Sequence, residues 1–144
     1  MTAGTDRRNV LIDDHEPTRL LIGRIVTQEL GARVTLPPTC EDALGLAQGT
    51  KFDVILLDLL MPGIGGYEVL RRIRVEGANR ATPILVISVM SDSDSIERCR
   101  LLGATAFVAK PVDRELVTTM LRSLLASKPS SGLPEGRPGL PGSV

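Results

Sequence analysis

The sequence of 144 residues has no tryptophan, one tyrosine and two phenylalanines, so its core must be built from aliphatic side chains. Neither charge is in excess, with 17 basic and 17 acidic residues. This balance argues against a dedicated nucleic-acid-binding protein, because such proteins collect phosphates on a basic face. We therefore interpret the cluster of Arg71, Arg72 and Arg74 as the solvated side of a helix.

Cysteine and long apolar runs are also scarce. Cys40 and Cys99 both lie in helical patterns among small or apolar neighbours, so we expect free, buried thiols rather than a disulfide. No apolar run is long enough to span a bilayer, and the N-terminus lacks the apolar stretch of a signal peptide. These absences predict a soluble, cytoplasmic protein that contacts neither nucleic acid nor membrane directly.

Five short apolar runs rich in β-branched residues predict strands, and several are apolar at consecutive positions, as is typical of strands covered on both faces. They are Val10–Ile12, Arg33–Leu36, Val54–Leu57, Ile84–Val89 and Ala106–Ala109. Segments with helical spacing follow each strand. They comprise Glu16–Leu30, a helix capped by Thr39 and ending near Gly49, a helix from Tyr67, Ser95–Leu102 with Ile96 and Cys99 inward, and a helix capped by Asp113 that repeats Leu116, Val117, Met120, Leu121 and Leu124.

Strands that alternate with helices predict parallel pairing with right-handed crossovers, and hence a doubly wound α/β fold with helices on both faces of a five-stranded sheet. The turn after the first strand, Asp13 to Glu16, contains no glycine, which excludes the glycine-rich turn of dinucleotide-binding folds. We therefore expect the flavodoxin-like strand order 2-1-3-4-5. Residues 9–126 would form this domain, residues 1–8 an N-terminal extension, and residues 127–144 a flexible tail or linker rich in proline, glycine and serine.

Ligands of such sheets bind outside the carboxyl ends of the strands, at the point where the strand order reverses. Asp13 and Asp14 follow the first strand, Asp58 follows the third, and Ser88 and Lys110 stand at the ends of the fourth and fifth. Three converging carboxylates repel one another unless a cation joins them, and Mg²⁺ suits a site of oxygen ligands. A carboxylate that faces both a metal and a lysine is well placed to attack phosphorus.

The chain from Asn9 to about Leu125 resembles a bacterial two-component response-regulator receiver domain of the chemotaxis-regulator type. The residues that carry the resemblance are Val10–Asp14, Asp58–Gly63, Pro83–Ser88, Gly103-Ala104, Phe107 and Lys110-Pro111. The resemblance implies that residues 9–126 are a receiver domain and that Asp58 accepts a phosphoryl group from a sensor histidine kinase, a phosphotransfer protein or a small phosphodonor. It also implies that the protein assists its own phosphorylation and slow dephosphorylation without being a turnover enzyme.

The resemblance assigns further roles to individual positions. Mg²⁺, or Mn²⁺, would be bound by Asp14, by Asp58 and by the backbone carbonyl of Leu60, with Asp13 acting largely through water. Lys110 would pair with Asp58 and then with the phosphoryl group, and the peptide bond before Pro111 would be cis. Ser88 would move toward the phosphate and Phe107 would turn inward. The face made by the fourth helix, fifth strand and fifth helix would then contact an unknown effector.

Three features of the sequence depart from the family pattern. Leu60 and Met90 are apolar where the family orients the water that hydrolyses the acyl phosphate, which predicts a slowly decaying phosphoform. Gly65 stands where an acidic residue is usual, which predicts a looser start of the third helix. Thr105-Ala106 replaces an acidic pair of many DNA-binding members, so their symmetric dimer is not implied.

Two other functions are compatible with parts of the pattern. An aspartate-nucleophile phosphatase on a related fold would need a second acid two residues after Asp58, where Leu60 stands. A receiver-like module that binds partners without phosphorylation usually lacks one of the acids or the lysine, and here Asp13, Asp14, Asp58 and Lys110 are all present. Both alternatives are therefore weaker than the phosphoacceptor interpretation.

Overall fold

The computed structural model describes residues 9–13, 17–59 and 65–126. The expected N-terminal extension and the proline- and glycine-rich tail lie outside these residues. Within them, strands and helices alternate along the whole chain. The elements are β1 (Asn9–Asp13), α1 (Pro17–Arg24), η2 (Ile25–Glu29), β2 (Arg33–Thr35), α2 (Cys40–Gly49), β3 (Val54–Asp58), α3 (Gly66–Val75), β4 (Ile84–Ser88), α4 (Ser93–Leu102), β5 (Ala106–Ala109) and α5 (Arg114–Ala126).

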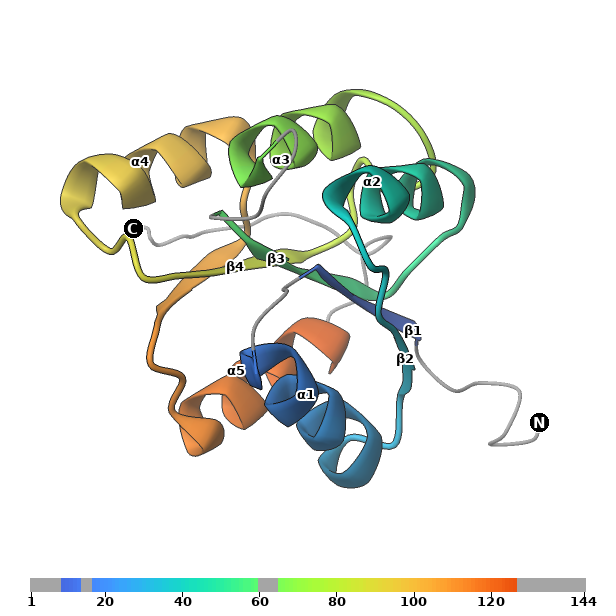
Figure 1. Cartoon of the computed structure of the whole chain (residues 1–144), viewed down its shortest axis with the longest axis vertical. Coiled ribbons are helices and arrows are strands. Elements are labelled where there is room, and N and C mark those ends of the chain that lie inside the picture. The colour runs from blue at the N-terminus through green and yellow to red at the C-terminus, as the bar shows by residue number, and fades with distance from the viewer. Residues whose placement is uncertain (1–8, 14–16, 60–64, 127–144) are drawn as a thin grey trace.

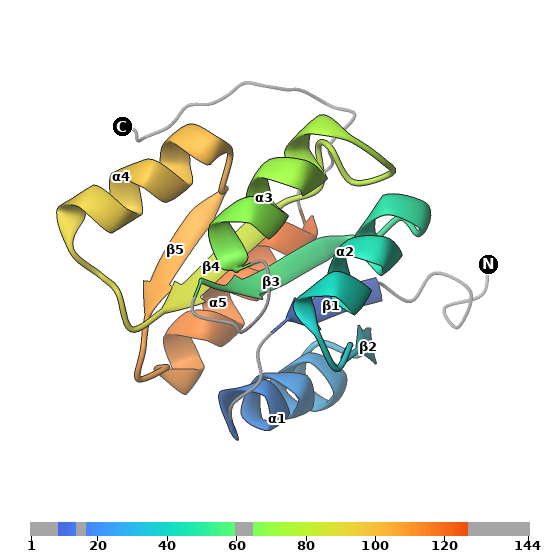
Figure 2. The same ribbon diagram turned by 45° about the horizontal axis from the view of Figure 1, so that its top comes forward.

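The five strands form one parallel sheet in the order β2-β1-β3-β4-β5, which confirms the predicted fold. Helices α2, α3 and α4 cover one face of the sheet, and α1 and α5 cover the other (Figure 1; Figure 2). Because every pairing is parallel, the carboxyl ends of all five strands lie at the same edge. That edge is where the predicted site residues should meet.

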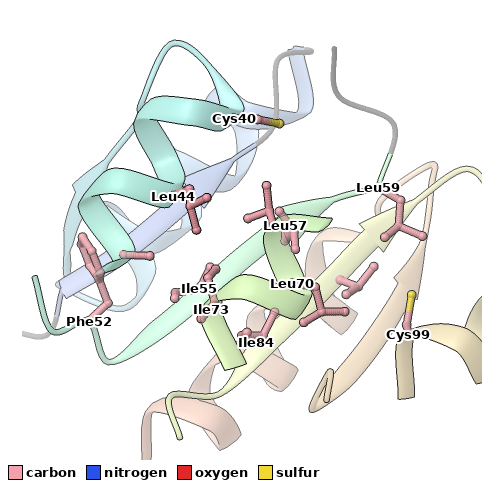
Figure 3. Packing of buried hydrophobic residues seen from close by; sticks show 13 residues of the cluster. Cys40, Leu44, Phe52, Ile55, Leu57, Leu59, Leu70, Ile73, Ile84 and Cys99 are labelled. Atoms are coloured by element: carbon pink, nitrogen blue, oxygen red, sulfur yellow. The ribbon is translucent and has the colours of Figure 1, made fainter. Parts of the chain in front are cut away.

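Aliphatic side chains fill both layers between the sheet and the helices, as the scarcity of aromatic residues predicts. One cluster joins β3 and β4 to the helices α2, α3 and α4, and includes Cys40, Phe52, Leu70 and Cys99 (Figure 3). The other joins the sheet to α1, η2 and α5. Both cysteines are buried and neither forms a disulfide, as expected. No helix within the described ranges has the length and apolarity needed to span a membrane.

The predicted helix caps are present. The Oγ1 atom of Thr39 accepts a hydrogen bond from the backbone N–H of Asp42 at 3.0 Å, and Asp113 Oδ1 accepts one from the N–H of Leu116 at 3.1 Å. Gly103 ends α4 with a left-handed φ of 107°. These local rules position the helices that lead into and out of the site.

Two inward-facing side chains and one helix boundary were predicted wrongly. Ile96 is 38% exposed and Leu116 is 49% exposed, because each lies at the edge of the apolar stripe of its helix and not at its centre. Helix α4 begins at Ser93, ahead of the predicted Ser95, because Asp92 caps it by accepting a hydrogen bond from the N–H of Ser95 at 3.0 Å.

The first helix departs from the single α-helix expected over Glu16–Leu30. Its described part begins at Pro17 and changes at Ile25 into the π-helical turn η2. Thr27 lies in this turn, and its hydroxyl donates to the carbonyl oxygen of Gly23 at 3.0 Å. Side-chain bonds of this kind to the preceding turn compete with the regular ladder and are found where helices deform.

The arginine cluster of α3 divides into two parts. Arg71 and Arg72 are surface residues that both donate to Glu68, as expected for a solvated helix face. Arg74 differs from this expectation, because its side chain is only partly exposed and its guanidinium donates to backbone carbonyls of two loops. Its contacts are described further below.

Candidate functional site

Asp58 is the last residue of β3, a strand whose five residues are all buried. The apolar sequence Val54–Leu57 keeps the strand between two helical layers, so the carboxylate that follows emerges at the edge of the sheet without leaving the interior. Asp58 is in register with Ile87 of β4. On the other side of β3, the preceding residue, Leu57, is in register with Asp13 of β1. The sheet therefore brings the backbone of Asp13 beside the end of β3, as predicted.

Lys110 follows β5 and reaches this carboxylate. Its Nζ atom lies 2.8 Å from Asp58 Oδ2, and the two side chains are only 8% and 3% exposed. Desolvating two charges is costly, so such a pair persists only where the groups are held close together. The backbone N–H of Lys110 donates to the carbonyl oxygen of Ser88 at 2.9 Å, which anchors the lysine to the end of β4. The Lys110–Pro111 peptide bond is cis, as the resemblance implies.

Ser88 is the last residue of β4 and is completely buried. Its Oγ atom accepts a hydrogen bond from the backbone N–H of Met90 at 3.0 Å. A hydroxyl that accepts one bond still carries a hydrogen that it can donate. Ser88 is thus ready to donate to an oxygen that arrives at the carboxyl edge of the sheet.

Phe107 lies on β5 in register with Val86. Its ring is half-buried and packs against the cluster under α2, α3 and α4, whereas the next residue, Val108, belongs to the opposite cluster. This alternation places Phe107 on the face of the sheet covered by α4. A single conformation does not test the predicted rotation of its ring.

The predicted metal ligands fall only partly within the described residues. Asp14 and Leu60 lie outside them, and only the backbone of Asp13 is described. Among the residues that are described, no group of three or more candidate ligands gathers. The part that is described fits a hard divalent cation, because a buried carboxylate stands at the end of β3 beside the strand that ends in Asp13.

Gly66 is a site residue whose role was missed from the sequence. A Cβ atom placed on it would lie 2.5 Å from both the carbonyl oxygen of Asp58 and the Cα atom of Leu59, which is closer than real Cβ atoms approach. Its N–H donates to the carbonyl oxygen of Leu59 at 3.1 Å. The first turn of α3 therefore rests directly on the backbone that carries Asp58. The pair Gly65-Gly66 was a visible signal, but its interpretation concerned only the start of α3.

Gly65 forms the N-cap of α3 with a φ of 85° and makes no side-chain cap hydrogen bond, and the looser start of α3 stays a prediction. Among the described residues, apart from its neighbours in the chain, no atom lies within 4 Å of a Cβ placed on Gly65. The two adjacent glycines thus serve different purposes. Gly65 allows a left-handed backbone, and Gly66 allows a close approach.

The sequence model of the response regulator receiver domain matches residues 10–122. Sensory/regulatory protein RpfC of Xanthomonas campestris pv. campestris is 33% identical over 122 residues, which cover 83% of this chain. Protein PilH of Pseudomonas aeruginosa is 26% identical and matches 81% of this chain. The chain spans 17% of the length of RpfC but 97% of that of PilH.

Two solved structures agree with the fold over nearly their whole length. The chemotaxis protein CheY4 of Vibrio cholerae superposes with a TM-score of 0.75 at 28% identity, covering 83% of this chain and 99% of its own. The receiver domain of a Pseudomonas aeruginosa sensor histidine kinase superposes with a TM-score of 0.73 at 26% identity, covering 84% and 99%. That structure has a magnesium ion coordinated in the active site cleft.

Proposed function

The chain belongs to the response regulator receiver domain family of two-component signalling, and we propose that it is a phosphorylation switch in which Asp58 is the phosphoacceptor. The observation that carries the proposal is the buried pair of Asp58 and Lys110, 2.8 Å apart at the carboxyl edge of the sheet. A nucleophile and a cation held together in this way have little use in a module that only binds partners.

Phosphoryl transfer to Asp58 requires little covalent chemistry from the protein. A carboxylate oxygen of Asp58 forms a bond to phosphorus while the bond from phosphorus to the donor's imidazole nitrogen breaks, and the electron pair of that bond stays on the imidazole. The protein's contribution is positioning and charge. Burial of Asp58 excludes bulk water from its carboxylate, and Lys110 is close enough to turn from the carboxylate to the new phosphoryl oxygens.

A divalent cation, Mg²⁺ or Mn²⁺, would be held by Asp58 with Asp13, Asp14 and the carbonyl oxygen of Leu60. When bound, it would neutralise charge on the transferring phosphoryl oxygens. The magnesium ion in the Pseudomonas aeruginosa receiver domain supports this assignment.

The response to phosphorylation would begin at Ser88. Its hydroxyl donates to a phosphoryl oxygen once the group is present, and in moving it releases the space beside β5 that Phe107 can enter. The altered face of α4, β5 and α5 then contacts an effector of unknown identity. The phosphodonor would be a histidine kinase or a phosphotransfer protein, which is consistent with relatives that are sensory proteins or sensor kinases.

The same residues argue for a slow return to the unphosphorylated state, and for a protein that is not a turnover enzyme. Met90, two residues past Ser88, uses its backbone N–H on the Ser88 hydroxyl and has an apolar side chain. Such a side chain cannot orient a hydrolytic water. The phosphoform should therefore persist far beyond seconds without a phosphatase, which the decay of the phosphorylated mass over time would measure.

The test is intact-mass spectrometry after incubation with Mg²⁺ and acetyl phosphate. The wild type should gain one phosphoryl group, and Asp58→Asn should gain none. Asp53→Asn is the matched control, because Asp53 precedes the same strand at its opposite end and accepts a hydrogen bond from the N–H of Asn9 at 2.7 Å. It should be phosphorylated like the wild type.

Each other outcome favours a different function. If the wild type gains no phosphoryl group, the remaining function is that of an interaction module that works without phosphorylation. Continuous release of inorganic phosphate from acetyl phosphate, at a rate far above the decay of a stable phosphoform, would indicate a phosphatase. A gain that survives Asp58→Asn would place the acceptor elsewhere.

A further inference from the structure

Arg74, in the last turn of α3, links two loops by hydrogen bonds. Its Nε atom donates to the carbonyl oxygen of Gly103 at 2.8 Å. Its Nη1 atom donates to the carbonyl oxygens of Asn79 at 3.2 Å and Arg80 at 3.1 Å, and Nη2 lies 3.4 Å from Thr105 Oγ1. One guanidinium thus joins the loop before β4 to the junction between α4 and β5.

This guanidinium is held by neutral oxygens. No carboxylate of the described residues forms an ion pair with it, and burial lowers the pKa of Arg74 to about 10. The side chain is still charged at neutral pH. The carbonyl oxygen of Gly103 at the C-terminal end of α4 and those of Asn79 and Arg80 in the loop before β4 stabilise a cation there. Hydrogen bonds to four oxygens of these two segments fix the orientation of the guanidinium.

The junction that Arg74 contacts is tightly built. Gly103 has a left-handed backbone, and a Cβ atom on it would lie 2.8 Å from Cγ of Arg74, so the arginine stem lies flat on this glycine. Thr105 continues the connection, because its Oγ1 atom accepts a hydrogen bond from the N–H of Ile84 at 3.0 Å and its N–H donates to the carbonyl oxygen of Ile84 at 2.9 Å. The C-terminal end of α4 is thereby tied to α3 and to the first residue of β4.

The N-terminal half of α4 is held differently. Over the described residues, the side-chain hydrogen bonds of segment 91–98 stay within α4 and its cap, where Asp92 accepts from the N–H and the hydroxyl of Ser95 at 3.0 Å and 2.8 Å. Arg98 of this segment contacts α3, since the Cζ atom of its guanidinium lies 4.0 Å from the centroid of the Tyr67 ring. One end of α4 is therefore fixed by a network of hydrogen bonds, and the end nearer Ser88 is not.

We propose that Arg74 is a positioning residue of the switch, which clamps the junction of α4 and β5 so that a change at Ser88 moves the loop after β4 and the N-terminal half of α4. This inference rests on the proposed phosphorylation of Asp58. Without the clamp, the same change at Ser88 would spread along the whole of α4 and into the start of β5.

Hydrogen–deuterium exchange with and without beryllofluoride and Mg²⁺ tests the clamp on the full chain. In the wild type, we expect beryllofluoride to change exchange in residues 89–98 and to leave residues 100–106 unchanged. In Arg74→Met, the response should extend into residues 100–106, with a change of roughly tenfold in exchange rate there, as expected when one or two net hydrogen bonds are lost. Arg72→Met is the matched control and should behave like the wild type, because Arg72 pairs with Glu68 on the surface.

If Arg74 had only a structural role, Arg74→Met would raise the exchange of residues 100–106 to the same extent with and without beryllofluoride. That result would overturn the proposal. A wild-type response of equal size in residues 89–98 and 100–106 would also overturn it, while leaving the phosphoacceptor function intact. The absence of any wild-type response would contradict both. If Arg74→Met does not fold, Arg74→Lys keeps the charge but loses the planar fork, and its response should extend partway into residues 100–106.

Discussion

At the residue scale, Gly66 limits where the backbone of Asp58 can lie. The first turn of α3 can contact the end of β3 because Gly66 has no side chain. A Cβ atom there would lie 2.5 Å from the carbonyl oxygen of Asp58 and from the Cα atom of Leu59. These are backbone atoms of the nucleophile's own strand end and cannot rotate away. A substitution at Gly66 should therefore act on the chemistry of Asp58 and not only on the stability of α3.

We expect Gly66→Ala to lower the rate of phosphorylation by acetyl phosphate at least about tenfold and to destabilise the fold by about 1–3 kcal/mol, as overpacking does. Gly65→Ala is the matched control. It strains a backbone with a φ of 85° at a cost of about 1 kcal/mol, but its Cβ atom meets none of the described residues within 4 Å, so its rate should stay close to that of the wild type. Equal rates for the two variants would show that Gly66 does not position Asp58.

The pair of Asp58 and Lys110 permits a second prediction at this scale. Lys110→Met should lower the free energy of unfolding by about 3 kcal/mol, because it leaves the buried carboxylate without its cation. In an Asp58→Asn background the same change should cost much less, since no charge is left unpaired. Urea denaturation of the four proteins in this double-mutant cycle measures the difference. An identical loss in both backgrounds would mean that the pair is not coupled.

Asp58, Ser88 and Lys110 could be predicted from the sequence because each directly follows or ends a strand, and one rule about parallel sheets brings strand ends together. Gly66 and Arg74 could not be predicted in the same way. The role of a glycine in a close approach depends on a backbone from another part of the chain, and the contacts of Arg74 depend on how α4 ends. Neither leaves a periodic pattern in the sequence.

At the scale of elements, the first turn of α3 is stabilised by charge, since Gly65 supplies no side-chain cap. Hydrogen bonds from Arg71 and Arg72 lower the pKa of Glu68 from 4.5 to about 2. Because the carboxyl is a stronger acid in the folded than in the unfolded chain, its contribution to stability is complete above pH 4.5. That contribution is lost as the pH falls toward 2.

Glu68→Gln should therefore be less stable than the wild type at pH 7, and the two should converge as the pH falls below 4.5. Denaturant midpoints measured across this range give the difference. Arg71→Met and Arg72→Met together remove the hydrogen bonds that lower the pKa of Glu68. In that background Glu68→Gln should therefore have no pH-dependent effect on stability. A constant difference between Glu68→Gln and the wild type from pH 7 to the acid limit would contradict the assignment.

Several element boundaries followed local rules, although the start of α4 was missed because its cap, Asp92, was not recognised. Thr39, Asp113 and Gly103 act through atoms within a few residues, so their positions predict where helices begin or end. The π-helical turn η2 was not predicted, because a shift from α- to π-helical bonding depends on local competition and packing that the apolar stripe does not encode. The exposure of Ile96 and Leu116 shows the same limit, since apolar spacing fixes a stripe but not its edges.

At the scale of the whole molecule, strand order was predictable because few topologies satisfy alternating strands and helices with right-handed crossovers. This order makes β1 and β3 neighbours and so brings Asp13 beside the strand that carries Asp58. The likeness to a receiver domain with bound magnesium agrees with that arrangement. Asp14 and Leu60, which complete the predicted metal site, stay predictions because they lie outside the described residues.

The most direct test of the central claim is to locate the phosphoryl group. After phosphorylation with acetyl phosphate and Mg²⁺, borohydride reduces an aspartyl phosphate to homoserine, and peptide sequencing by mass spectrometry then shows which aspartate was converted. We predict homoserine at position 58 and intact aspartate at positions 13, 14 and 53. Homoserine at any of those three positions, or a phosphorylated protein with aspartate unchanged at 58, would contradict the assignment of Asp58 as the phosphoacceptor.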